Sequence, residues 1–549
     1  MVNLGPSKGC HTCKRRRIKC DEGKPHCQRC LRSSRECGGY EKKPITVRFK
    51  HDMVVRGSKT TQQKSRPPRT PPEQQSILPG LSPAERDAAL SFFLRPFASI
   101  SRDFESSRGF FEVLGPVVAS EHPSSAVSMA VTAIALRLHR LWREGRGLST
   151  ASTRPPETLC LALGRLQHAV LDPSEMKSPK TVLAALVLQF DETISAVWDR
   201  RQPKETHHEG AVALFMNQGH KSSDTNYSHH LVAYILHNEV SAAIREARPA
   251  PPRIRSWIRD DDIPLTPSFT LDIVGISVAN VQHRFSQAMQ QVRREAASPH
   301  HLSKVWSHIR SVDDDLLRWV ETLPGEWRPL ALPRGQEAGS TIVTYVNGCH
   351  VYPSIQIALI WNTWRCYRLI LLKMALILLH VEPQAASLFN LFDDLHVDTA
   401  DQMSFFTGRA MQELVDLICY SVPFHLGNRQ QRSTLHDFTD PSIVHPSYHD
   451  LPSSDEKFLL YRNSDNYMTS EDHKRHVIVR GPWHILSPLG YIRMLLSGEF
   501  GHIFAETLRD GQADWIYEQL ARGFLILDLA PGPDSPQRRP KSTETPVLI

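Results

Sequence analysis

The spacing of apolar and polar residues is helical over most of the chain. From residue 82 onward, apolar side chains recur at intervals of three and four residues, which is the period of an amphipathic α-helix. The first helix should begin at Ser82, because Ser82-Pro83-Ala84-Glu85 combines a serine N-cap, a proline in the first turn and a glutamate three residues after the cap. Strand-like alternation is rare. We therefore expect an all-α body over residues 81–530.

Apolar stretches with this period predict the individual helices. They lie at 125–143, 159–171, 181–197, 209–216, 231–247, 276–297, 306–320, 352–379, 409–420, 489–496 and 515–527. The segment 352–379 is long and apolar, which predicts a central buried helix.

Three stretches lack this periodicity. Residues 41–80 have a basic, proline-rich composition typical of a flexible linker, and they show no heptad pattern for a coiled coil. Residues 427–476 are polar and predict a long loop within the body, and residues 531–549 predict a disordered tail. No run of about 18 uncharged apolar residues occurs, so we expect no membrane partner.

Charge is distributed unevenly along the chain. The whole sequence of 549 residues has a formal net charge of +7. Residues 1–70 contain 19 Lys and Arg against 5 Asp and Glu, a net charge of +14, so the remainder carries −7. A short basic head on a mildly acidic body predicts a polyanionic partner for the head, most simply nucleic acid. The 40% apolar content excludes a globally disordered chain.

Six of the ten cysteines fall within the head. They are Cys10, Cys13, Cys20, Cys27, Cys30 and Cys37. Their spacing is C-x2-C-x6-C repeated twice, with six residues between the copies. Six thiolates can give two Zn²⁺ ions four sulfurs each if two sulfurs are shared, and the symmetry of the copies makes Cys10 and Cys27 the shared pair. With every position filled by protein sulfur, both ions would be structural, and residues 1–40 would fold as a small two-zinc domain with two short helices related by a pseudo-two-fold axis.

A basic run separates the second and third cysteines. Its charged residues are Lys14, Arg15, Arg16, Arg17 and Lys19. Ile18 is the single apolar residue in the run and should face inward. A short basic helix of this kind can present Arg or Lys to guanine O6 and N7 in the major groove, while neighbouring residues hold phosphates. The matching segment of the second copy is much less basic, so we expect the first copy to read bases.

These features together resemble the fungal Zn2Cys6 zinc binuclear cluster transcription factors. The resemblance covers all six cysteines, the basic run and the Cys37-Gly38-Gly39-Tyr40 exit. It implies that the first and fourth cysteines bridge the zincs, that Arg16 and Arg17 read bases, and that the target is a CGG-like triplet. It also implies a nuclear regulator of RNA polymerase II genes, not an enzyme. The body resembles, more loosely, the helical regulatory domain of such proteins.

Several alternatives remain open. The body could carry a composite active site or bind a metabolite, or the chain could be an adaptor or repressor that occupies DNA without recruiting activators. Without a coiled coil, homodimerisation would have to use the helical body. A small-molecule effector or a co-regulator are further candidate partners. Aromatic residues could line an effector pocket, although core packing is the better expectation for them: Phe92, Phe93, Trp198, Trp361, Trp364 and Trp483.

Overall fold

The computed structural model divides the chain into two compact units, residues 1–68 and 69–549, which are described separately. It describes residues 10–21, 27–33, 35, 37, 82–98, 105–145, 156–199, 201–218, 225–252, 254, 264–294, 299–332, 341–383 and 400–529. The predicted linker at 41–80 and the predicted tail at 531–549 both lie outside the described residues.

The first unit is the cysteine-rich head. It contains two short helices, α1 (His11–Arg15) and α2 (Gln28–Arg32), which contact each other. Its small core consists of buried cysteines with Ile18 packed against them. The fold class expected from the sequence is confirmed for this unit.

The second unit is a helical body. Its longer helices are α3 (Pro83–Phe93), α4 (Phe111–Ser120), α5 (Ala126–Glu144), α7 (Glu157–Leu171), α8 (Pro179–Trp198), α9 (Thr206–Gln218), α10 (Thr225–Arg245), α12 (Pro267–Arg293), α13 (Pro299–Glu321), α14 (Ile355–Val381), α15 (Ala400–Leu426), α17 (Ser470–Ser497) and α19 (Gln512–Ile526). The shorter helical segments are η1 (Leu94–Ala98), η2 (Glu175–Lys177), η3 (Gly325–Trp327), η5 (Leu435–Phe438), η6 (Tyr448–Asp450), α16 (Glu456–Arg462) and α18 (Gly501–Ala505). Within the described residues the strands are β1 (Leu330–Ala331) and β2 (His350–Val351), which pair antiparallel. The all-α expectation is therefore confirmed.

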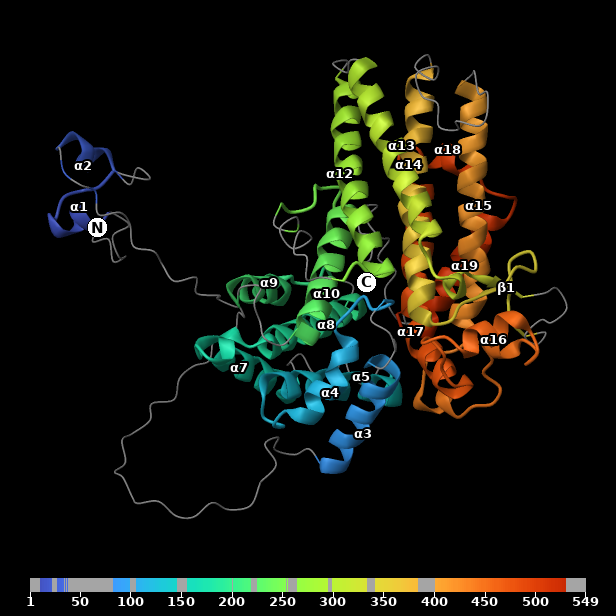
Figure 1. Cartoon of the computed structure of the whole chain (residues 1–549), viewed down its shortest axis with the longest axis horizontal. Helices are drawn as coiled ribbons and strands as arrows, with labels where there is room; N and C mark the ends of the chain where they lie inside the picture. Colours follow the sequence, from blue (N-terminus) through green and yellow to red (C-terminus); the bar gives the residue numbers. More distant parts are fainter. Residues whose placement is uncertain are drawn as a thin grey trace, which may run out of the picture. The chain divides into compact units, whose positions relative to one another are not determined.

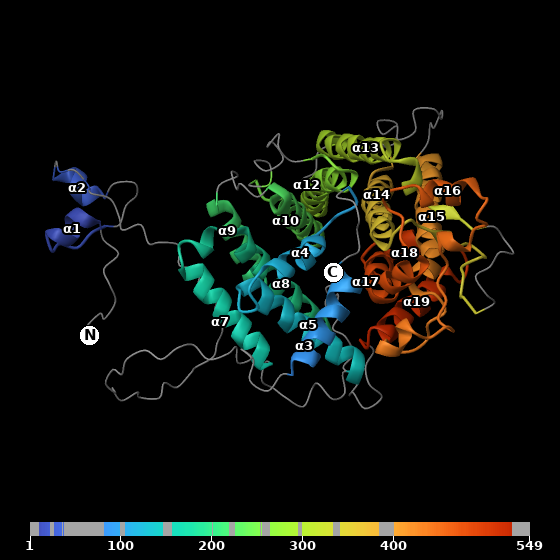
Figure 2. The ribbon, with the colours of Figure 1, turned by 60° about the horizontal axis from the view of Figure 1, so that its bottom comes forward.

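Helix α14 is the centre of the body. It packs against α12, α13, α15 and α17, and Figure 2 shows it between the first two and the last two. The predicted central helix at 352–379 is thus found as α14, and 20 of its 27 residues are buried. A second group, made of α3, α5, α7, α8 and α9, packs below the upright helices in Figure 1. Helix α8 is long and apolar enough to cross a membrane, but 78% of its apolar stretch is buried inside the body, as in a core helix.

Local sequence signals account for several helix ends. The Glu85 N–H donates to Ser82 Oγ at 3.2 Å and the Ser82 N–H to Glu85 Oε2 at 3.4 Å, which completes the predicted capping box of α3. Helix α5 begins after the N-cap Ser125 and ends at Gly145, whose φ of 75° is in the left-handed region that glycine adopts without strain.

Two helices are longer than the sequence pattern predicts. The segment 409–420 is the middle of α15, and 489–496 is the last part of α17. Pro482 and Pro488 lie inside α17, and prolines normally end a helix. Gly481 allows α15 and α17 to approach closely, because a Cβ there would overlap the backbone carbonyl of His425. Tertiary packing of α17 against α14, α15 and α19 therefore outweighs its local signals.

Buried arginines organise the polar stretch 427–476. This stretch folds into η5, η6, α16 and the start of α17, joined by irregular chain. Arg429 donates from Nη2 to Asp437 at 2.7 Å and from Nη1 to the carbonyl of Ile478 at 2.9 Å. Arg522 donates from Nε to the carbonyl of Arg429 at 2.7 Å. These bonds satisfy buried backbone groups that would otherwise be costly, so a polar sequence can still be ordered.

Three histidines of the body are kept uncharged, of which His425 and His473 are buried and His350 is half-buried. Burial lowers the pKa of His425 and His350 to about 4 and that of His473 to about 3. The Nδ1 of His425 lies 2.8 Å from the carbonyl of Ser421, and His473 packs against the ring of Phe424. The folded state therefore holds these imidazoles neutral.

Acid should destabilise the body through these histidines. Below pH about 6.5 the unfolded chain binds protons that the folded chain does not, so stability is full above that pH and falls as pH drops towards 4. Each such histidine adds about 1.4 kcal/mol per pH unit to this slope. Urea unfolding between pH 7 and 5 should show it. His473→Gln should make the slope shallower, whereas His436→Gln, at an exposed position, should not. An unchanged slope in His473→Gln would exclude His473 as a source.

Candidate zinc and DNA-binding site

The two copies of the cysteine motif fold in the same way. Cys10 is the N-cap of α1, and its Sγ accepts a hydrogen bond from the Cys13 N–H at 3.3 Å. Cys27 is the N-cap of α2, and its Sγ accepts from the Cys30 N–H at 3.3 Å. A thiolate is well suited to this position because it offsets the unpaired N–H groups of the first turn.

The third cysteine of each copy returns to the first. The Cys10 N–H donates to Cys20 Sγ at 3.5 Å, and the Cys27 N–H donates to Cys37 Sγ at 3.4 Å. The same pair of contacts in both copies gives the head its pseudo-two-fold symmetry.

The sulfur atoms form two overlapping groups of four. One group is Cys10, Cys13, Cys20 and Cys27, and the other is Cys10, Cys27, Cys30 and Cys37. Within each group all sulfurs lie within 4.8 Å of one another, and Cys10 and Cys27 belong to both. Among the described residues these are the groups of three or more side chains able to hold a metal ion.

The spacing of the sulfurs fits tetrahedral zinc. A Zn–S bond of about 2.3 Å in a tetrahedron places neighbouring sulfurs about 3.8 Å apart. The Sγ–Sγ distances are 3.6 Å for Cys10–Cys27, 3.7 Å for Cys13–Cys27 and 3.8 Å for Cys10–Cys30. These distances are far longer than a disulfide bond of about 2.05 Å. The donor set therefore suits zinc, which the cysteines of both groups would hold as a structural ion with no position left for water.

Gathering these sulfurs is unfavourable unless a cation is present. Burial raises the pKa of the Cys13 thiol to about 12 and raises the pKa of Cys10 and of Cys27. Zinc binding removes these protons and neutralises the thiolates, so folding of the head should be coupled to the metal.

The basic run follows a different path from the single helix that its sequence suggests. Helix α1 ends at Arg15, Arg16 is the C-cap, and Arg17 has a φ of 54°, in the left-handed region. The Ile18 N–H donates to the carbonyl of Cys13 at 3.2 Å, and the Arg17 N–H donates to that of Lys14 at 3.1 Å. This pattern is a Schellman motif, in which the left-handed position usually holds glycine.

The turn separates the apolar residue from the basic ones. Ile18 packs against the cysteine cluster, as predicted. Arg15, Arg16, Arg17 and Lys19 are exposed, and Lys14 is half-buried. The structure thus brings the predicted basic residues together on and just after α1, with the exposed charges free to meet a polyanion.

Two polar contacts in the head were not anticipated from the sequence. The Asp21 carboxylate accepts hydrogen bonds from the Gln28 and Arg29 N–H groups at 2.9 and 3.0 Å, and so caps α2. Arg16 Nη1 donates to Ser33 Oγ at 3.4 Å. Ser33 is the C-cap of α2, so this bond links corresponding positions of the two copies. An alignment of the two sequence copies places Arg16 opposite Ser33, and that equivalence is the signal by which the contact could have been found.

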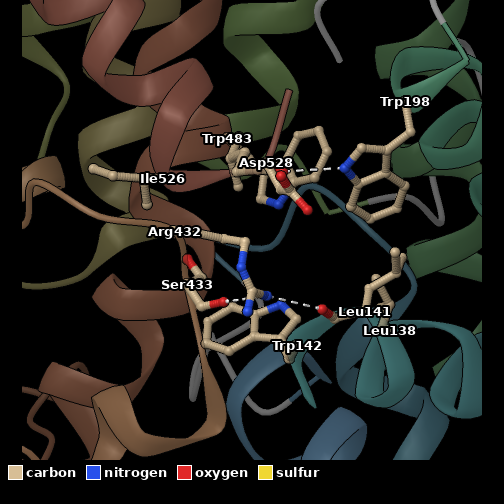
Figure 3. Close-up of a pocket in the computed structure, with 10 residues that line it drawn as sticks. Leu138, Leu141, Trp142, Trp198, Arg432, Ser433, Trp483, Ile526 and Asp528 are labelled. Atoms are coloured by element: carbon tan, nitrogen blue, oxygen red, sulfur yellow. Dashed lines mark hydrogen bonds between the residues drawn. The ribbon is translucent and has the colours of Figure 1, made fainter. Parts of the chain in front are cut away.

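Of the six aromatic residues considered for an effector pocket, two line a pocket in the structure (Figure 3) and four do not. Trp198 and Trp483 meet edge to face, with ring centroids 5.6 Å apart, and both line a pocket in the body. The other four lie elsewhere in the body core or partly buried against it: Phe92, Phe93, Trp361 and Trp364. Trp361 and Trp364 each donate an indole N–H to a backbone carbonyl, which marks them as packing residues.

The architecture therefore defines a cysteine-rich, zinc-type head attached to a helical body. Residues 8–45 match the family model of the fungal Zn(2)-Cys(6) binuclear cluster domain. The head belongs to that family, as the resemblance of its motifs implies.

Most of the curated relatives match this chain over short stretches, and the chain spans well under half the length of each of them. The transcriptional regulatory protein moc3 of Schizosaccharomyces pombe is 66% identical over 32 residues, which is 6% of each chain. Arginine metabolism regulation protein II of Saccharomyces cerevisiae is 57% identical over 45 residues, 8% of this chain and 5% of the relative. The transcription regulator lscL of Purpureocillium lilacinum is 28% identical over 168 residues, 29% of this chain and 37% of the relative. The last match is too long to be confined to the head. No solved structure matches the chain significantly.

Proposed function

We propose that this chain is a sequence-specific DNA-binding transcription factor that acts in the nucleus on RNA polymerase II genes. The observation that carries the proposal is the exposed arginine turn, Arg15 to Arg17, fixed to a compact cysteine cluster. Two of the matched relatives are named as regulators of transcription, which supports a regulator over an enzyme. The acidic body would carry regulation, with homodimerisation through the body as part of the proposal.

In this proposal the end of α1 enters the major groove. Arg16 and Arg17 would donate to guanine O6 and N7 of a CGG-like triplet, and Lys14, Arg15 and Lys19 would hold phosphates. The Schellman turn supports this division, because it directs the backbone at Arg17 away from the helix while Ile18 anchors it to the cluster. Arg16 is further oriented by its bond to Ser33.

A selection experiment tests the proposed function directly. Zinc-loaded full-length protein, incubated with random double-stranded DNA, should enrich fragments that contain a CGG-like triplet, and a chelator should abolish the enrichment. Retention of DNA without any enriched sequence would contradict specific recognition, because phosphate contacts alone bind every sequence.

Arg17 should determine base preference more than affinity for DNA in general. Arg17→Gly keeps the left-handed turn without strain and removes the side chain that carries the guanidinium. Discrimination between the selected triplet and a single-base variant should fall about tenfold or more, since a bidentate contact contributes about 1–3 kcal/mol. The measurement is a titration of both DNAs at several salt concentrations.

Arg15→Ala is the matched control for Arg17→Gly. It should weaken binding to both DNAs equally and reduce the salt slope by about one, as expected for a phosphate contact. A uniform loss with a smaller salt slope in Arg17→Gly would instead assign Arg17 to a phosphate.

We further propose two structural zinc ions bridged by Cys10 and Cys27. The two sulfur groups that share these residues support this count.

Native mass spectrometry of the protein should therefore find two zincs. Cys27→Ala removes a ligand from both ions and should lose both, together with specific DNA binding. Cys37→Ala removes a ligand from one ion only, so the protein should keep more of the other zinc than Cys27→Ala does. Equal retention of one zinc by both variants would exclude the bridging role of Cys27.

A further inference from the structure

Ser33 is an exposed residue of the head that contacts one of the arginines proposed to read DNA. It is the C-cap of α2, just as Arg16 is the C-cap of α1. Arg16 Nη1 donates to Ser33 Oγ at 3.4 Å, so the two C-cap side chains meet. Both side chains are exposed, so the Ser33 hydroxyl is open to solvent while it contacts a guanidinium.

The chain turns after α2 as it does after α1. The Arg35 N–H donates to the carbonyl of Cys30 at 3.0 Å, which repeats the bond from Ile18 to Cys13 in the first copy. A hydroxyl group therefore occupies the position at which the first copy has a proposed base-reading arginine. The two copies share a backbone path here and differ in charge.

Arginines flank Ser33 in the sequence as well as in space. Arg32 precedes it, Arg35 follows two residues later, and Arg29 lies one turn earlier on α2, and all three are exposed. Arg16 adds a further guanidinium from the other copy. Arginine is well suited to bind phosphate, because its planar fork can donate two parallel hydrogen bonds. These surroundings favour a serine that carries a phosphoryl group.

We propose that Ser33 is a phosphorylation site and that its phosphate captures Arg16, which releases the head from DNA. The release rests on the function proposed above for the arginine turn. In the modification, Ser33 Oγ forms a bond to the γ-phosphorus of ATP and the bond from that phosphorus to the departing ADP oxygen breaks. The hydroxyl proton passes to a base of the protein kinase, which would belong to the class that selects serines flanked by basic residues.

The phosphate would change what Arg16 can bind. A phosphoserine carries a charge of about −1.5 to −2 at neutral pH and three acceptor oxygens. Its Oγ can no longer donate to the carbonyls of Arg29 and Cys30, at 2.9 and 3.1 Å. The loss of these neutral bonds is small beside the gain of a charge-assisted pair with Arg16. A captured Arg16 cannot donate to guanine, and the added negative charge repels the DNA backbone.

A labelling experiment establishes whether a kinase can reach Ser33. Zinc-loaded full-length protein is incubated with Mg²⁺, ATP and the catalytic domain of protein kinase C, a kinase that favours basic residues on both sides of its target. Mass spectrometry of peptides should place phosphate on Ser33, and Ser33→Ala should lose that phosphopeptide. Absence of phosphate from Ser33 would overturn the proposal.

Genetic encoding of phosphoserine at position 33 measures the effect on DNA binding. Affinity for the selected DNA should fall about tenfold or more, and discrimination against a single-base variant should fall with it, because Arg16 no longer contacts its base. Undiminished affinity would overturn the proposal. Loss of zinc from this protein would do the same, because the capture of Arg16 leaves the cysteine cluster intact.

Phosphoserine at position 307 is the matched control. Ser307 is exposed on α13, and its Oγ donates to the carbonyl three residues earlier, as Ser33 Oγ does. The modified body should bind the selected DNA as the unmodified protein does. An equal loss of affinity with phosphoserine at either position would contradict a local effect on Arg16.

Phosphorus NMR detects the capture without any DNA. The pKa of the phosphoserine phosphate, ordinarily about 6, should be lowered at position 33 by the Arg16 guanidinium, and Arg16→Gln should raise it again. An equal pKa with and without Arg16 would overturn the capture. If the unmodified protein selects no DNA, the proposed function fails although this pKa difference remains. If it selects DNA and the phosphoserine protein binds equally well, only the phosphorylation proposal fails.

Discussion

The contact between the sulfurs of Cys10 and Cys27, at 3.6 Å, is the constraint on which the head depends. The Cys10 sulfur also caps α1, and the Cys27 sulfur caps α2. Both sulfurs belong to both groups of four, so the two helix starts and the two groups are fixed by the same pair of atoms. A unit this small has little apolar surface to bury. Its geometry must therefore come from the metal and the caps, and the position of the arginine turn follows from both.

The body is stabilised by different means. Its core is extensive and apolar, and α14 is buried along nearly its whole length. Its polar segments are held in place by buried arginines that donate hydrogen bonds to backbone carbonyls, as Arg429 and Arg522 do around residues 427–437. The bonds are needed because an unpaired polar group in such a core is costly. Loss of zinc and loss of core packing should therefore affect separate parts of the chain.

Sequence patterns predicted those features that depend on spacing alone. The duplicated cysteine motif led to the shared pair, and helical periodicity found α5, α8 and α14 within a few residues. The full length of α17 was missed, because Pro482 and Pro488 are strong local breakers that only tertiary packing overrides. The cap from Asp21 and the bond from Arg16 to Ser33 were missed because they join the two copies across space. Trp198 and Trp483, for which core packing was the better expectation, meet at the boundary between α8 and α17 because the fold brings these distant segments together.

The left-handed conformation of Arg17 connects the fold of the head with its proposed role. A residue other than glycine in this conformation costs about 1–2 kcal/mol, and the Schellman turn would form more easily with glycine. Ile18 explains why the turn must exist, because it brings an apolar side chain back onto the cysteine cluster. It does not explain why the strained position holds arginine. A guanidinium at that position contributes nothing to the turn itself, whereas an exposed arginine on a rigid turn is suited to the base contact that we propose for it.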